Sequence, residues 1–60
     1  MSTEQTRLTA ALRELRARTG LSLAALAERT AYSKSSWERY LNGKILPPRQ
    51  AVRELCRIAD

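Results

Sequence analysis

The stretch AYSKSSWERYLNGK, residues 31–44, carries hydrogen-bonding side chains at helical spacing. If Trp37 marks the inward side of a helix that turns about 100° per residue, Tyr40 and Leu41 lie within about 60° of it and bury with it. The outward side then carries short or flexible polar groups, led by Ser35, Arg39 and Asn42, with Glu38 and Ser36 at its edges and Lys34 exposed in the first turn. These groups can form directed hydrogen bonds with a partner, but they make no recognisable catalytic set.

Such a helix face suits the major groove of double-stranded DNA. Arginine can donate to both acceptors of a guanine, and serine or asparagine can bond base edges or phosphates. Glu38 is the exception, because phosphates repel a carboxylate unless it accepts from cytosine or holds a neighbouring cation, for which Lys34 is the nearest candidate. Polar faces are common on surface helices, so a merely solvated face is the alternative.

Charge and length narrow the class of protein. The 60 residues predict a single domain, 1–60. A net charge of +5, mostly from nine arginines, favours a polyanionic partner, although solubility alone would also explain it. No apolar run approaches the roughly 18 residues of a membrane span, so we expect no membrane insertion within this chain.

The residues that usually support catalysis or metal binding are scarce. There is no histidine, and Cys56 is the only cysteine, so neither an intramolecular disulfide nor a Cys/His zinc cluster can be built. Without a histidine or a glycine-rich phosphate loop, an enzyme is not expected, and neither is a cofactor. We predict that Cys56 packs as a small apolar residue and that the setting is reducing and cytoplasmic.

Helical spacing dominates the whole chain and predicts four helices. The first runs from about residue 3 to 19, with Leu8, Leu12 and Leu15 on one face, and ends at Gly20. Arg16 falls about 40° from Leu12, so it should lie against the core and reach outward with its head group.

Two short helices, roughly 22–30 and 33–42, follow, and both have the same N-terminal capping pattern. Ser22 and Ser33 can each cap a helix, while the residue before each cap packs on one inside the helix, Leu21 on Leu26 and Tyr32 on Trp37. A turn of only about three residues joins the pair, which predicts a steep crossing as in a helix-turn-helix.

The last helix should begin near Pro48, after the terminator Asn42-Gly43 and the loop that contains both prolines. It carries an apolar arc on one side, formed by Ala51, Val52, Leu55, Ile58 and Ala59, with Cys56 at its margin. On the opposite side lies an arginine stripe, Arg49, Arg53 and Arg57, that we interpret as a solvated face, with Arg49 set apart by its position at the helix start.

From Leu8 to about Ala59 the chain resembles the phage-repressor-like, or XRE-type, helix-turn-helix DNA-binding domains of bacteria and phages. The resemblance is carried by GLSLAALAERT for the supporting helix, YSKSSWERYLNGK for the recognition helix and its exit, and the following LPP. It implies an all-α bundle of the lambda-repressor-like helix-turn-helix type. Members usually have a fifth helix, and this chain stops at Asp60, so either the domain is shortened or the chain is a piece of a longer protein.

The resemblance also implies roles for individual residues. Base-facing positions match Lys34, Ser35 and Arg39, with Ser36 close to the backbone or base edges. Phosphate-facing positions at the end of the recognition helix match Asn42 and Lys44, and Arg49 matches a basic position near the DNA backbone or minor groove.

The sequence departs from the family pattern within the helix-turn-helix itself. Leu23 replaces a glutamine that contacts phosphate in many members, so that contact should be absent. Ala31 takes a turn position usually given to glycine, where a left-handed conformation would cost about 1–2 kcal/mol. Arg16 matches an arginine that often pairs with an acid on the recognition helix, but the corresponding residue here is Leu41.

The sequence therefore predicts a sequence-specific DNA-binding domain of a bacterial transcriptional regulator. Its expected partners are double-stranded DNA and, because a single small module binds weakly, a second copy or the remainder of a longer chain. The alternative is a protein-interaction module on the same fold, either a head that docks on cytoskeletal proteins or an antitoxin. Leu23 and Glu38 favour that alternative slightly, since each weakens a phosphate-facing role.

Overall fold

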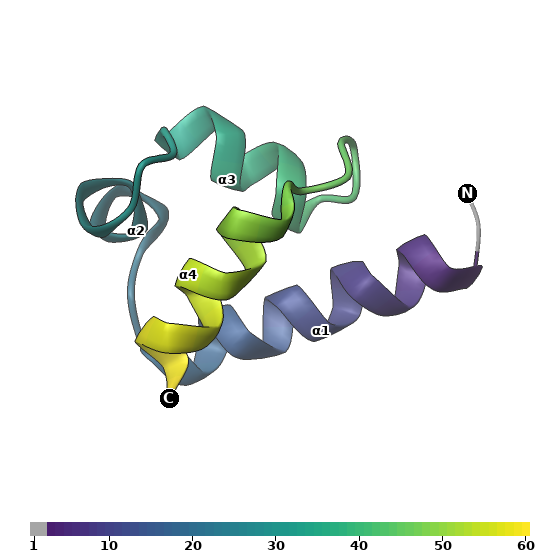
Figure 1. Ribbon diagram of the computed structural model, residues 1–60, viewed down its shortest axis with the longest axis horizontal. Helices are drawn as coiled ribbons and strands as arrows, with labels where there is room; N and C mark the ends of the chain where they lie inside the picture. Colours follow the sequence, from purple (N-terminus) through teal and green to yellow (C-terminus); the bar gives the residue numbers. More distant parts are fainter. Residues whose placement is uncertain (1–2) are drawn as a thin grey trace.

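A computed structural model describes residues 3–60, which form four helices and no strand. Helix α1 spans Thr3–Thr19, α2 spans Leu23–Arg29, α3 spans Lys34–Leu41 and α4 spans Arg49–Ala59. The order and approximate bounds agree with the four predicted helices. As Figure 1 shows, α1 is the longest element, and its N-terminal half projects beyond the contact with α4.

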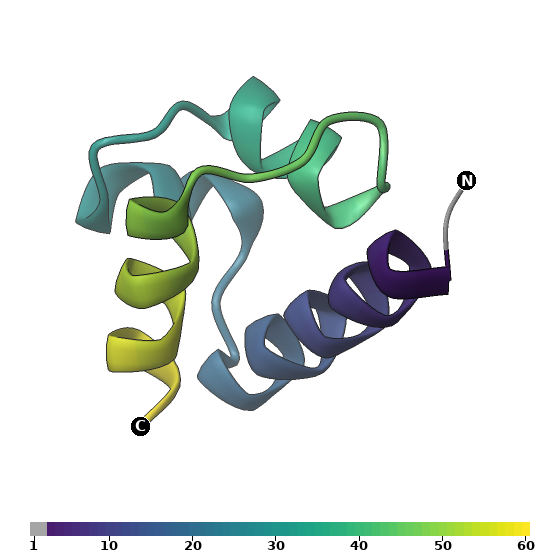
Figure 2. The same cartoon turned by 45° about the vertical axis from the view of Figure 1, so that its right-hand side comes forward.

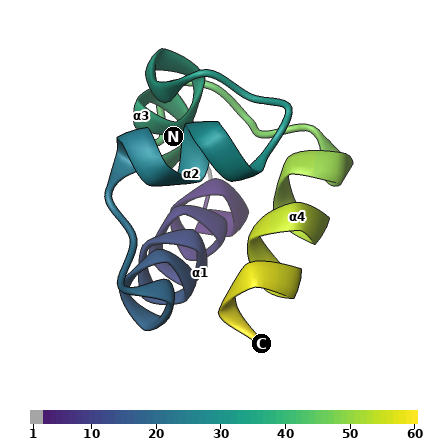
Figure 3. The same cartoon turned by 90° about the vertical axis from the view of Figure 1, so that its left-hand side faces the viewer.

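The helices pack as two pairs, α1 with α4 and α2 with α3, and α1 also contacts α3. Figure 2 shows α4 descending toward the C-terminal end of α1. Seen from the side, α2 and α3 lie over the α1 and α4 pair (Figure 3). This arrangement leaves one side of α3 free of the bundle.

The N-termini of α2 and α3 use the predicted caps. Ser22 Oγ accepts from the N–H of Ala25 at 3.1 Å, and Ser33 Oγ accepts from the N–H of Ser36 at 3.1 Å. Each cap satisfies a backbone donor that the helix itself leaves unpaired. The rings of Tyr32 and Trp37 meet edge to face with centroids 5.9 Å apart, so the aromatic pair across the second cap is confirmed.

Two glycines end helices, as predicted, with positive φ angles of 69° at Gly20 and 73° at Gly43. After α3, the N–H of Gly43 bonds the carbonyl of Tyr40 at 3.2 Å, and the N–H of Lys44 bonds that of Arg39 at 3.0 Å. This pair of bonds is the Schellman motif, which requires a left-handed residue at the glycine position. The end of α3 is therefore sharply defined.

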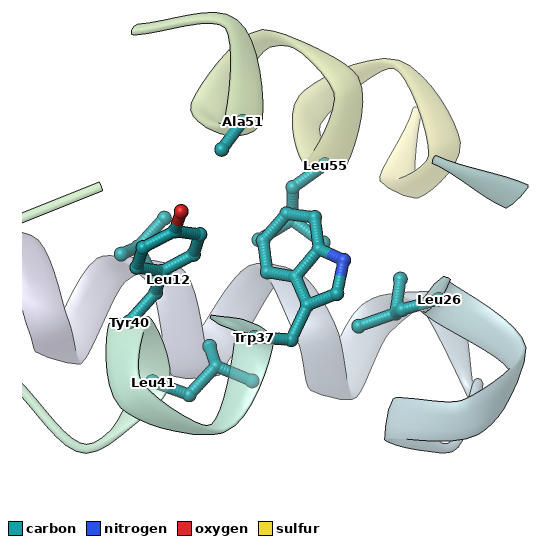
Figure 4. Packing of buried hydrophobic residues seen from close by; sticks show 7 residues of the cluster. All are labelled: Leu12, Leu26, Trp37, Tyr40, Leu41, Ala51 and Leu55. Carbon is teal, nitrogen blue, oxygen red and sulfur yellow. The ribbon is translucent and has the colours of Figure 1, made fainter. Parts of the chain in front are cut away.

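The core gathers around α3. Trp37 is fully buried, and the other buried members come from all four helices: Leu12, Leu26, Tyr40, Leu41, Ala51 and Leu55. Figure 4 shows the indole of Trp37 lying between α4 on one side and α1 on the other. The prediction that Trp37, Tyr40 and Leu41 face inward is thus confirmed.

Two expectations about single residues need correction. Cys56 is exposed rather than packed, because only the strip of α4 centred on Ala51 and Leu55 is fully buried, and Cys56 lies about 100° around the helix from Leu55. The left-handed turn considered for Ala31 is not adopted, since no residue other than glycine has a positive φ in the described chain. The turn instead uses extended backbone at Thr30, with φ −129° and ψ 174°.

Candidate nucleic-acid interface

The outward face of α3, defined by Lys34, Ser35, Arg39 and Asn42, is exposed along its whole length. None of these four side chains makes a hydrogen bond or ion pair within the part of the chain that the structure describes. Their polar groups therefore point to solvent and remain available to a partner. The outward face lies opposite the buried side of the same helix.

The other predicted contact residues surround this face. Ser36 is half-buried, and its Oγ accepts a hydrogen bond from the Ser33 hydroxyl at 3.0 Å, so it is partly engaged already. Lys44 is exposed just after the Schellman motif, and Arg49 is exposed at the first residue of α4. The structure thus brings Ser36 and Lys44 to the two ends of α3, while Arg49 stands on a separate helix.

Glu38 does not pair with Lys34, contrary to expectation. The only ion pair among residues 3–60 joins Arg57 to Glu54 at 4.0 Å. A basic residue four positions before an acidic one is the less favourable order on a helix. Glu38 instead lines a pocket of about 440 Å³ between α1 and α3, here called the α1–α3 pocket, together with Arg13, Arg16, Leu23, Leu41 and Asn42.

The turn between α2 and α3 is held by Thr30, which the sequence analysis missed. Its hydroxyl donates to the carbonyl of Leu26 at 2.7 Å and accepts from the indole N–H of Trp37 at 2.9 Å. The backbone N–H of Tyr32 lies 3.4 Å from the same oxygen. One half-buried hydroxyl therefore fixes α2, the turn and α3 relative to one another. A threonine at a helix C-terminus gives no sequence signal for such a role.

Two arginines of α1 connect that helix to the helix-turn-helix pair. Arg13 Nε donates to the carbonyl of Leu41 at 2.7 Å, and Arg16 Nε donates to the carbonyl of Leu21 at 3.1 Å. Arg16 is half-buried and so lies against the core as predicted, but Arg13 was overlooked. Its contact depends on how α1 crosses α3, which helical periodicity alone does not reveal.

A second polar cluster consists of Tyr32, Tyr40 and Glu54, none of which lines the α1–α3 pocket. Burial raises the pKa of Tyr32, with further contributions from the negative charge of Glu54 and from Tyr40. Glu54 Oε2 is buried without a hydrogen-bond partner in the described chain. This cluster involves none of the residues of the outward face.

Two short capped helices joined by a tight turn, with the second presenting a free polar face, define a helix-turn-helix domain. The chain belongs to the helix-turn-helix domain family, whose pattern matches residues 7–60 and which is typical of XRE-type, phage-repressor-like DNA-binding domains. No curated protein and no solved structure gives a significant match. None of the described helices is long and apolar enough to cross a membrane.

Proposed function

We propose that this chain is the sequence-specific double-stranded DNA-binding domain of a bacterial transcriptional regulator, acting in the cytoplasm. The observation that carries the proposal is the outward face of α3, whose exposed polar groups have no partner within the described chain. A helix inserted in the major groove needs exposed side chains that can reach base edges, and this face offers such unpartnered polar groups while the opposite side of the helix is buried. The net charge of +5 adds a sequence-independent attraction for the duplex.

Within that groove, each side chain has a chemically suited target. Arg39 donates to the two acceptors of a guanine, while Lys34 and Ser35 contact neighbouring base edges near the start of α3. Asn42 and Lys44 contact phosphates where the helix ends, and Ser36 contacts the backbone or a base edge at the rim. Arg49 contacts the backbone or minor groove from α4.

A single domain of this size makes few contacts, so two copies reading half-sites about one helical turn apart are expected. Selection of bound fragments from a random duplex pool, followed by salt titration of the recovered site, tests the proposal. We expect one enriched motif and an affinity that falls steeply with salt, because bound phosphates release counterions. Half-site symmetry in that motif would report the dimer at the same time.

The competing assignment, a protein-interaction module, makes the opposite prediction. A chain that recovers no motif and shows no binding to mixed duplex fragments at about 50 mM salt, where phosphate contacts are strong, would refute DNA binding. The interaction module would then be the assignment to pursue.

A further inference from the structure

The α1–α3 pocket contains two positive charges that form no ion pair within residues 3–60. Arg13 and Arg16 both line it, and neither forms an ion pair in the described chain. Each guanidinium uses its Nε atom to bond a backbone carbonyl, at 2.7 Å for Arg13 and 3.1 Å for Arg16. The two outer nitrogens of each group, with four further N–H donors, have no acceptor there.

The Nε bonds restrict where these outer nitrogens can lie. An arginine whose planar group is already held by one hydrogen bond loses less freedom when it binds a further acceptor. The anchors are also well placed, because Leu41 is the last residue of α3 and Leu21 immediately precedes the cap of α2. The two arginines are thus attached to both helices of the helix-turn-helix pair.

We propose that Arg13 and Arg16 form a phosphate-binding site in the α1–α3 pocket and that its ligand is a phosphodiester group of the bound duplex. This inference rests on the proposed DNA-binding function and names a contact outside α3. Leu23 and Leu41 line the same pocket, and their side chains offer no hydrogen bond. The side-chain donors of the pocket are therefore Arg13, Arg16 and Asn42. Guanidinium groups match phosphate geometry with paired donors.

The place of the pocket beside α3 fits a backbone contact. Asn42 belongs both to the outward face and to the pocket, so the pocket opens at the edge of the surface that enters the groove. The major groove is about 12 Å wide, close to the 10–12 Å diameter of a helix with its side chains. A helix in the groove is therefore flanked by phosphates, and a cationic site along its flank faces one of the two strands.

Because of Glu38, a single arginine would not be enough to attract a phosphate to the pocket. Its carboxylate lines the same pocket and would repel a phosphate. One guanidinium offsets that charge, and the second leaves the pocket net positive. The site therefore needs both arginines to attract an anion.

The test measures the salt dependence of binding to the selected duplex for Arg13→Gln, Arg16→Gln and the double variant. Because both arginines hold the same phosphate and the site needs both, each single variant and the double variant should lower the slope of log affinity against log salt by about 0.9, the value for one lost phosphate contact. Arg18→Gln is the matched control, since Arg18 is exposed on the same helix and lines a different groove with Cys56 and Arg57. Arg13→Lys and Arg16→Lys keep the charge and should restore the slope.

Thermal unfolding of every variant separates loss of the site from loss of the fold, and the slopes are compared at a temperature where all are folded. Equal slopes for the double variant and the wild type, or a change no greater than that of Arg18→Gln, would overturn the proposal. If the slopes are unchanged but millimolar inorganic phosphate shifts the Arg13 and Arg16 Nε–H resonances, the pocket takes free phosphate and the duplex assignment is wrong. A wild type that binds no duplex at all would instead refute the proposed function itself.

Discussion

The two sides of α3 differ in whether their side chains find contacts and hydrogen-bond partners within the protein. On the inner side, the Trp37 ring is fully buried, contacts Tyr32 and Tyr40 edge to face at 5.9 and 5.7 Å, and donates its N–H to Thr30. On the outward face, Lys34, Ser35, Arg39 and Asn42 have no intramolecular partner among the described residues. The inner side of this eight-residue helix thus makes its interactions within the protein, whereas the polar groups of the outward face contact only solvent.

This contrast separates what holds the domain together from what it can bind. A buried aromatic group with all its polar atoms paired contributes to stability and leaves nothing for a partner. An exposed polar group without a partner contributes little to stability, and its contact energy appears only on binding. Substitutions on the two sides should therefore produce effects of different kinds.

The largest effect is expected for Trp37→Ala. Removing a buried tryptophan costs about 3–5 kcal/mol, while 60 residues typically provide only about 3–9 kcal/mol in total. The variant should be largely unfolded at 25 °C. Far-UV circular dichroism measures this, because the variant lacks the only tryptophan and its unfolding cannot be followed by tryptophan fluorescence. Ser35→Ala, on the outward face of the same helix, is the control and should melt within a few degrees of the wild type. A Ser35→Ala variant as unstable as Trp37→Ala would abolish the contrast between the two sides.

Thr30→Val should produce the next largest loss of stability. Valine keeps the shape of threonine but leaves the indole N–H of Trp37 without its acceptor. A buried donor left unpaired lowers the free energy of unfolding by about 1–3 kcal/mol. In a domain of this size, each kcal/mol lowers the melting temperature by roughly 4–8 °C. Differential scanning calorimetry measures the shift, and the indole N–H resonance reports the lost bond. An unchanged melting temperature would mean that Thr30 does not hold the turn.

Sequence patterns predicted the inner side better than the rest of the site. Trp37, Tyr40 and Leu41 follow helical spacing, and Ser33 is a cap with a known preference, so local rules place all four. Thr30 and Arg13 act across a turn or between helices, and their partners follow from the packing of the chain rather than from any period. For the same reason, the exposed position of Cys56 was not foreseen, because the width of the buried strip on α4 is set by tertiary packing.

Arg39→Ala should change recognition without changing stability. Loss of the proposed bidentate contact to guanine would remove about 1–3 kcal/mol of discrimination at one base pair, so the ratio of affinities for the preferred and random duplexes should fall by about 5- to 150-fold. Fluorescence anisotropy with both duplexes measures the ratio. Lys44→Ala provides the comparison, since loss of a phosphate contact should weaken both duplexes by the same factor. If Arg39→Ala weakens both equally, the base-reading role belongs to another residue of the outward face.

The smallest predicted effect belongs to Glu38→Gln, at the boundary between the outward face and the α1–α3 pocket. The carboxylate is exposed and unpaired in the described chain, so its repulsion of phosphate is screened by solvent and salt. Exposed charge interactions contribute about 0.2–1 kcal/mol, so affinity for any duplex should rise by no more than about fivefold. Titration at low salt measures the gain, which should shrink as salt is added. A loss of affinity confined to the selected motif would show instead that Glu38 accepts a hydrogen bond from a base, and the recognition surface would then extend from the outward face to the edge of the pocket.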